Sequence, residues 1–259
     1  MACVRARVRR IGIVMALALL GLAPALAMTP IAQAFPASTG GTPASAPFSW
    51  QNEQWCPSYH SYNGCDATQS PSQYSVSFAP AQVSESSRSG VQLTMNRSAT
   101  SSGAINTWGE ETFNPPTTFT ATITLQCNSQ GQILNWPAFW TVGTVGSWPA
   151  DGEIDILEGQ RGHATWSYHY VDASGSNALQ TGTPSGNWCG THTYSASWQD
   201  SSITMSWDGR QVGRVSSSQI GVPIVSDPMY AIFDYGASPV YGGPTAGGAS
   251  MRVLSFSAN

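Results

Sequence analysis

The sequence predicts an all-β protein built as a two-sheet antiparallel sandwich. Short apolar segments with a period of two recur from about residue 49 onwards. Clusters of Gly, Pro, Ser and Asn separate these segments, and no stretch keeps a helical period. About a dozen such strands in roughly 210 residues favour one sandwich over two domains. A large sandwich often curves, and a concave face would suit an extended polymer.

Residues 1–34 are typical of a secretory signal peptide. Four Arg precede an apolar run from Ile11 to Ala27, and Ala-x-Ala sequences end at Ala27 and at Ala34. We expect cleavage after Ala34, a secreted protein and no stable membrane association. A retained membrane anchor is the alternative, but the Gly and Pro residues within the run and the paired cleavage sites argue against it.

The charge of the chain disfavours nucleic acid as a partner. The sequence has no Lys, and ten Arg stand against 14 acidic residues, for a net charge of −4. Removal of the leader takes away four Arg and no acidic residue, which lowers the net charge from −4 to −8. A nucleic-acid-binding protein needs clustered basic side chains to neutralise phosphates.

Residues 35–48 are rich in Pro, Ser, Thr, Gly and Ala and show no apolar period. This composition predicts a flexible linker, so the folded domain is expected to span residues 49–259.

Four cysteines remain once the leader is removed, and an even number in an exported protein favours disulfides, with three pairings open. We predict that Cys56 pairs with Cys65 in a short loop and that Cys127 pairs with Cys189. Metal binding is the weaker alternative, because no two of these cysteines show a C-x-x-C spacing.

Several strands can be placed from alternation alone. Residues 119–127 alternate apolar and polar side chains without a break, as a half-buried strand should. Residues 203–207 do the same, and Asp208-Gly209 after them is a hairpin turn signal that leads into residues 211–215. Further strands are expected at residues 229–233 and 251–256.

A cluster of three acidic residues, Glu153, Asp155 and Glu158, lies among β-forming residues. On a regular strand, Glu153 and Asp155 would share one face and Glu158 would point to the other. A β-bulge at Ile156 and Leu157 would turn Glu158 to the same face. The sequence therefore predicts three carboxyls lining one groove.

Three neighbouring carboxyls cannot all ionise freely. Two like charges about 5 Å apart repel by roughly 3 kcal/mol at an effective dielectric of about 20, which is about two pK units. We expect one carboxyl to hold its proton near neutral pH while another stays anionic, as acid-assisted glycoside cleavage requires. A calcium loop or a solvated turn is the alternative, but strand-forming Ile154, Ile156 and Leu157 do not suit a flexible loop.

Aromatic residues flank the acids in the sequence and offer flat apolar faces to sugars. Trp148, five residues before Glu153 in a loop with Gly and Pro, is the strongest candidate. His169, on an expected strand, could reach the cleft floor or serve as a structural donor. No H-E-x-x-H or G-x-S-x-G motif is present, which disfavours zinc and serine hydrolases. The candidate substrate-binding residues are Trp108, Trp136, Trp148, His169 and Trp188.

Residues 153–158 (E-I-D-I-L-E) resemble the E-x-D-x-x-E signature of glycoside hydrolase family 16, which includes laminarinases, agarases and carrageenases. Residues 136–140 (W-P-A-F-W) and Trp148-Pro149 resemble the flanking elements of that family. The resemblance implies a concanavalin-like jelly roll with a concave substrate cleft. It also implies a retaining mechanism with Glu153 as nucleophile, Asp155 as orienting acid and Glu158 as general acid/base.

The expected function is that of a secreted endo-acting glycosidase that hydrolyses β-1,3-glucan or a related neutral glucan or galactan by double displacement. Arg161 is the only Arg between Arg97 and Arg210, which disfavours a sulfated polymer. A lectin-like sandwich without catalysis and a transglycosylase with the same residues are the alternatives. We expect a monomer that needs no cofactor; a structural calcium ion is compatible with the chain, but nothing in the sequence indicates one.

Overall fold

The structure, a computed structural model, describes residues 73–86, 90–108, 110–145 and 147–259. The predicted leader (1–34), the predicted linker (35–48) and the predicted Cys56–Cys65 pair lie outside these residues. Helix in the described ranges is limited to the 3-10 turn η1 (Pro80–Gln82) and the short α1 (Ser217–Ile220). Neither has the length or apolar character to cross a membrane.

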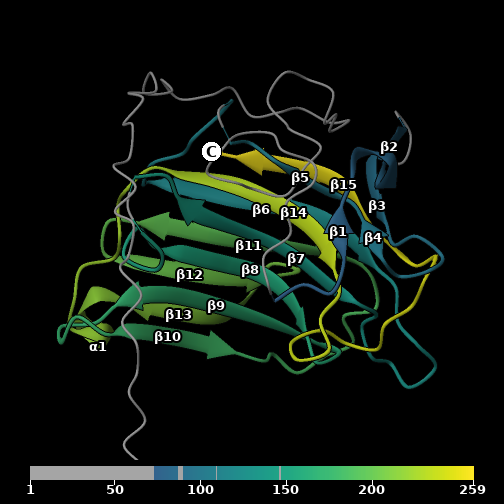
Figure 1. Cartoon of the computed structure of the whole chain (residues 1–259). Coiled ribbons are helices and arrows are strands. Elements are labelled where there is room, and N and C mark those ends of the chain that lie inside the picture. Colours follow the sequence, from purple (N-terminus) through teal and green to yellow (C-terminus); the bar gives the residue numbers. More distant parts are fainter. Residues whose placement is uncertain (1–72, 87–89, 109, 146) are drawn as a thin grey trace, which may run out of the picture. The chain divides into compact units, whose positions relative to one another are not determined.

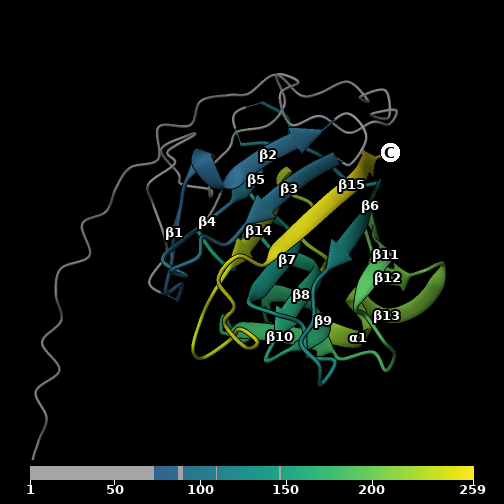
Figure 2. The same ribbon diagram turned by 90° about the vertical axis from the view of Figure 1, so that its right-hand side faces the viewer.

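Two antiparallel sheets form the domain, which confirms the predicted fold class (Figures 1 and 2). The six-stranded sheet has the order β10-β9-β8-β7-β14-β5 and the seven-stranded sheet the order β13-β12-β11-β6-β15-β3-β2. The first sheet comprises β5 (Ala104–Asn106), β7 (Trp136–Gly143), β8 (Glu153–Gln160), β9 (His163–Val171), β10 (Asn177–Gly182) and β14 (Met229–Gly236). The second comprises β2 (Val83–Ser86), β3 (Gly90–Thr94), β6 (Thr117–Leu125), β11 (Gly190–Gln199), β12 (Ser202–Trp207), β13 (Arg210–Ser216) and β15 (Ser250–Ala258). A small separate pair joins β1 (Ser77–Phe78) to β4 (Ser101–Ser102) in parallel.

The strands placed by alternation are confirmed. In β6 every second side chain is buried from one end to the other, as residues 119–127 predicted. Strands β12 and β13 form the predicted hairpin, and both turn residues, Asp208 and Gly209, have positive φ, as a tight hairpin turn requires. The expected strands at residues 229–233 and 251–256 extend to become β14 and β15.

The main hydrophobic core lies between the two sheets. The six-stranded sheet contributes Phe139, Ile154 and Phe233, and the seven-stranded sheet contributes Phe119 and Trp198. The rings of Phe139 and Phe233, on adjacent strands, stack with centroids 4.4 Å apart. This core fixes one face of the six-stranded sheet and leaves the opposite face for the site.

The predicted Cys127–Cys189 disulfide is present, with the two Cα atoms 5.7 Å apart. It joins the residues just after β6 to the residue just before β11. The strands β6 and β11 are themselves paired along their length.

Candidate active site

Strand β8 carries the three acidic residues at the middle of the six-stranded sheet, between β7 and β9. The strand starts after Gly152, whose φ of +76° is favourable for glycine. The partners of Glu153 are Val142 and His169, so the start of β8 is hydrogen-bonded on both sides. The acids are therefore built on a central strand rather than on a loop, which restricts their movement.

A β-bulge brings the third acid to the face of the first two. Asp155 pairs with Trp140 and Leu157 pairs with Phe139, so Ile156 is an extra residue in the ladder. The register against β9 shifts between Asp155 and Glu158. Ile156 and Leu157 are fully buried in the main core, and Glu158 turns to the opposite face. The predicted bulge at Ile156 and Leu157 is thus confirmed.

The opposite sheet anchors this bulge. The indole N–H of Trp207, on β12, donates a hydrogen bond of 3.0 Å to the carbonyl oxygen of Ile156. Trp207 is itself fully buried. Because a bulge leaves a backbone group outside the ladder, a donor from the facing sheet satisfies a carbonyl whose burial would otherwise be costly.

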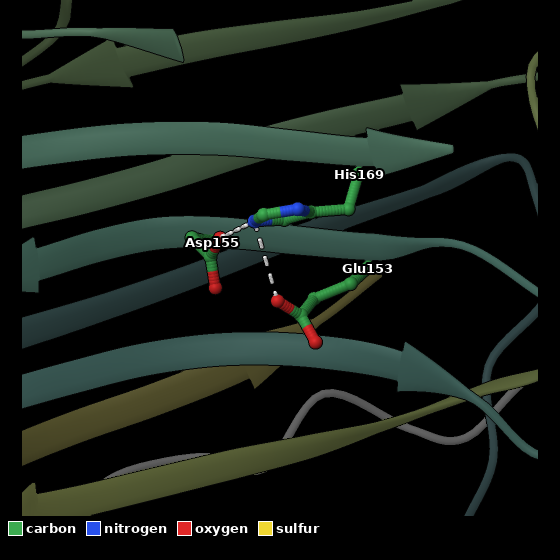
Figure 3. Close-up of side chains that lie close together, drawn as sticks. All are labelled: Glu153, Asp155 and His169. Atoms are coloured by element: carbon green, nitrogen blue, oxygen red, sulfur yellow. Dashed lines mark ion pairs between the residues drawn. The ribbon is translucent and has the colours of Figure 1, made fainter. Parts of the chain in front are cut away.

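Glu153, Asp155 and His169 form one contact group (Figure 3). Nε2 of His169 lies 3.3 Å from Oδ2 of Asp155 and 3.5 Å from Oε1 of Glu153. The ring reaches from β9 to both carboxyls on β8, as Figure 3 shows. Each of the three residues can offer one metal-ligating atom, and these atoms all lie within 4.8 Å of one another.

Two tryptophans donate hydrogen bonds to the two glutamates. The indole N–H of Trp148 lies 3.0 Å from Oε2 of Glu153, and that of Trp136 lies 2.7 Å from Oε1 of Glu158. The side-chain amide of Gln160 also donates to Oε2 of Glu158, at 2.6 Å. Both glutamates are therefore held in place by N–H donors, which stabilise the ionised form.

Asp234 on β14 is a fourth carboxyl that sequence analysis missed. It pairs across the sheet with Ala138, which in turn pairs with Glu158, so Asp234 lies in the same row. Its Oδ2 accepts hydrogen bonds from the indole of Trp140 at 2.9 Å and from the hydroxyl of Tyr74 at 3.4 Å. Burial raises the pKa of Asp234 to about 7. A lone acid in the apolar run of β14 was the signal that could have identified it.

Burial is the main cause of the raised pKa values in the site. Burial, followed by the charge of Asp155, raises the pKa of Glu158 to about 8, although the donors Trp136 and Gln160 lower it. The pKa of Glu153 is also raised well above its usual value, by burial and then by the charges of Asp155 and Glu158. A proton on Glu158 removes one of these charges, so it brings the pKa of Glu153 back toward its usual value.

Only some of the predicted aromatic residues contact the acids in the structure. Trp148 is 48% exposed, and its ring lies 5.5 Å from that of His169. Trp136 is only 7% exposed and stacks with Tyr74 at 4.7 Å and Tyr241 at 5.4 Å. Trp136 therefore meets the site through its N–H, while Trp148 and Tyr241 offer open ring surface.

Trp108 and Trp188 both pack against other aromatic rings. Trp108 contacts the edge of Tyr230, in a second apolar cluster that also contains Val142, the strand partner of Glu153. Trp188 instead packs against Trp207 of the seven-stranded sheet, with ring centroids 4.8 Å apart, and is a partly buried residue at the edge of the main core. Trp108 thus lies on the face of the acids, and Trp188 packs on the core side.

The arrangement can supply both halves of an acid-assisted displacement. A buried carboxyl whose pKa lies near 8 holds a proton at neutral pH, and a second carboxyl on the same strand can act as a nucleophile or base. An exposed indole beside the second carboxyl can position an apolar ring face of a substrate.

The chain was compared with known families and proteins. The model of the family described as glycosyl hydrolases family 16 matches residues 70–238. The endo-1,3-1,4-beta-glycanase ExsH of Rhizobium meliloti is 25% identical over 122 residues, which are 46% of this chain and 25% of that protein. A probable endo-1,3(4)-beta-glucanase of Aspergillus fumigatus is 49% identical over 63 residues, 21% of this chain and 9% of that protein. The chain thus spans a quarter or less of the length of these relatives.

Solved structures of similar fold extend the comparison. A Bacteroides ovatus GH16 protein of a mixed-linkage glucan locus, in complex with a G4G4G3G product, has a TM-score of 0.62 and 21% identity, over 80% of this chain and 95% of that chain. SCLam, a non-specific endo-beta-1,3(4)-glucanase from family GH16, has a TM-score of 0.60 and 20% identity, over 84% of this chain and 86% of that chain. At these identities the likeness shows a shared fold.

Proposed function

The chain belongs to the glycosyl hydrolases family 16, and on that premise we propose that it is an endo-acting β-glucanase that hydrolyses O-glycosyl bonds within 1,3- or mixed 1,3-1,4-linked chains. The observation that carries the proposal is the bulge in β8, which gathers Glu153, Asp155 and Glu158 onto one face of a central strand. A sandwich that only binds sugars has no need of a nucleophile paired with a protonated acid.

The proposed reaction is a double displacement with retention of configuration. In the first step Glu158 gives its proton to the glycosidic oxygen while a carboxylate oxygen of Glu153 attacks the anomeric carbon, so the leaving chain departs as an alcohol. In the second step Glu158 removes a proton from water, whose oxygen displaces Glu153 from the anomeric carbon. The chemistry uses only side chains of this protein and water.

His169 and Asp155 act on Glu153 in this scheme. The imidazole Nε2 lies 3.3 Å from Asp155 and 3.5 Å from Glu153, so an N–H at this atom can donate a hydrogen bond to either carboxylate. The Trp148 N–H holds the second oxygen of Glu153, which leaves Oε1 to react. These contacts orient the nucleophile and support its ionised form.

A neutral glucan fits the surroundings of the acids. Exposed aromatic rings lie beside both glutamates: Trp148 contacts Glu153, and Tyr241 stacks on Trp136, the donor to Glu158. Flat apolar rings suit the CH faces of unsulfated sugars. The names of the relatives, which include endo-1,3(4)-beta-glucanases, favour glucan over galactan.

Secretion is part of the proposal. The basic, apolar and Ala-x-Ala segments of residues 1–34 support it, and so does the Cys127–Cys189 disulfide, because disulfides persist in oxidising compartments. Protein collected from the culture medium should begin at Phe35; an intact Met1 would contradict this.

A polysaccharide screen tests the proposed function. Wild type should release oligosaccharides of several sizes from laminarin or lichenan, and NMR of the first products should show the β-anomer. Glu153→Gln should lose cleavage and still bind the polymer in an affinity gel, because the aromatic rings are unchanged. Asp200→Asn, in an exposed turn, is the matched control and should stay active. Full activity of Glu153→Gln, or binding without cleavage by wild type, would contradict the proposal.

A further inference from the structure

The contact group of Glu153, Asp155 and His169 has the spacing of a metal site. A metal ion with ligands at about 2.1 Å places tetrahedral ligand atoms about 3.4 Å apart. The observed separations from Nε2 of His169 are 3.3 Å to Asp155 and 3.5 Å to Glu153. All three donor atoms lie within 4.8 Å of one another, so the two carboxylate oxygens need to approach each other by at most about 1.4 Å to surround one ion.

We propose that Glu153, Asp155 and His169 bind one divalent transition metal ion such as Zn²⁺, and that the bound ion inhibits the enzyme. One imidazole nitrogen and two carboxylate oxygens form a donor set that suits Zn²⁺. Ca²⁺ takes six to eight oxygen ligands and Mg²⁺ keeps several of its waters, so these ions should bind weakly here. The inhibition rests on the proposed function, whereas the binding does not.

The surroundings hold these ligands in place. Glu153 and His169 are direct partners on neighbouring strands, and Asp155 lies two residues along the same strand. The N–H of Trp148 bonds Oε2 of Glu153, which leaves Oε1 on the side of His169. Rigid strands and an outer hydrogen bond to a ligand are the features that give a metal site its affinity.

The group is also accessible and negatively charged. The side chains of Glu153 and His169 are 16% and 22% exposed, so an ion can reach them from solvent. Asp155 also interacts electrostatically with Glu158 and Asp234, so two further carboxyls lie close to the group. An acidic site raises the local concentration of cations.

Binding at this position would block the reaction directly. The ion would take Oε1 of Glu153, the oxygen that the proposed mechanism uses for attack. Polysaccharide and metal ion should therefore exclude each other, and inhibition should be competitive with substrate.

A second histidine offers a matched control. Nδ1 of His192 lies 2.7 Å from Oδ2 of Asp208, and its Nε2 lies 3.1 Å from the carbonyl oxygen of Cys189. This pair has one carboxylate where the proposed site has two, and both ring nitrogens already have partners. His192→Gln should leave metal binding unchanged.

Calorimetric titration of the EDTA-treated, dialysed protein with ZnCl₂ is the direct test. Wild type should bind one ion per chain, and His169→Gln and Asp155→Asn should each weaken binding more than about tenfold. A hundredfold excess of CaCl₂ should not compete. Absence of Zn²⁺ binding to wild type, or equal loss in His169→Gln and His192→Gln, would overturn the proposed site. Asp155→Asn decides the matter if His169→Gln does not fold.

The inhibition is measured separately by laminarin hydrolysis at several ZnCl₂ concentrations. The apparent KM should rise while kcat stays constant, and EDTA should restore the rate. A fall in kcat at unchanged KM would overturn the inhibitory role. An inactive wild type would instead overturn the proposed function, since calorimetry reports on the metal site without any turnover.

Discussion

The two ends of the acidic strand differ in how closed they are. At the Glu158 end, two N–H donors bind the carboxyl, and one of them, Trp136, is 7% exposed and stacked with two tyrosines. At the Glu153 end, the donor is Trp148, which is 48% exposed, and His169 contacts the carboxyl from the next strand. Of the two glutamate carboxyls on this strand, that of Glu158 is thus the more closed, and we call it sealed; that of Glu153 is the more open.

This difference shows how neighbouring residues of one type can take separate roles. Burial raises the pKa of both carboxyls, but the indole that binds Glu158 is itself covered, which suits a proton donor. The open carboxyl has an imidazole beside it and space for an attacked carbon, which suits a nucleophile. Sequence order alone does not distinguish them, because both are glutamates on one face of β8.

The largest expected effect comes from removing the acid at the sealed end. Glu158→Gln should lower kcat/KM on laminarin by about 10²- to 10⁴-fold, because the leaving oxygen no longer receives a proton. An aryl glycoside whose leaving group needs no proton should lose much less. Steady-state rates on the two substrates provide the measurement, and equal losses on both would assign Glu158 another role.

Removal of the indole donors should shift opposite limbs of the pH profile. Trp136→Phe removes a bond that lowers the pKa of Glu158, so the basic limb should move up by about one pH unit and widen the profile. Trp148→Phe removes the corresponding bond to Glu153, so the acid limb should move up and narrow the profile. The measurement is kcat/KM from pH 4 to 10. Shifts of the same limb in both variants would show that the two ends are not distinct.

A smaller effect concerns stability. The folded-state pKa of Asp234 is raised from 3.8 to about 7, so its stabilising contribution is fully present below the lower value and is lost as pH rises through about 7. The melting temperature of wild type should therefore fall between pH 5 and pH 8. In Asp234→Asn this fall should be smaller by about 3 °C or more, whereas Asp200→Asn should retain it. Calorimetric melts across this range decide the point, and identical slopes in all three proteins would argue against a buried, titrating Asp234.

The groups that sequence alone could place are those set by local rules. Alternation along residues 119–127 located β6. The bulge was located because, on a regular strand, Glu158 would face away from Glu153 and Asp155. The Cys127–Cys189 bond followed from choosing among three pairings. The strand and the bulge depend on residues adjacent in the sequence, and the disulfide depends on a choice among a few cysteines.

The groups that sequence alone could not place depend on the order of strands in the sheet. Asp234 reaches the row of Glu158 only because β14 pairs with β7, and β7 with β8. Trp188 follows the acids in the sequence, yet packs against the core side through Trp207. Trp136 was expected to face sugar, but its ring is covered and its N–H binds Glu158. Proximity in sequence is a poor guide once strands from distant segments become neighbours.

The bond from Trp207 to the carbonyl of Ile156 links the spacing of the reactive groups to the joining of the two sheets. Heating that separates the two sheets would break this bond, relax the β-bulge and turn Glu158 away from Glu153. Inactivation on warming should then accompany melting of the two sheets, since the spacing of the reactive pair depends on a bond that joins them. The durability of the catalyst is in this sense a property of the entire sandwich.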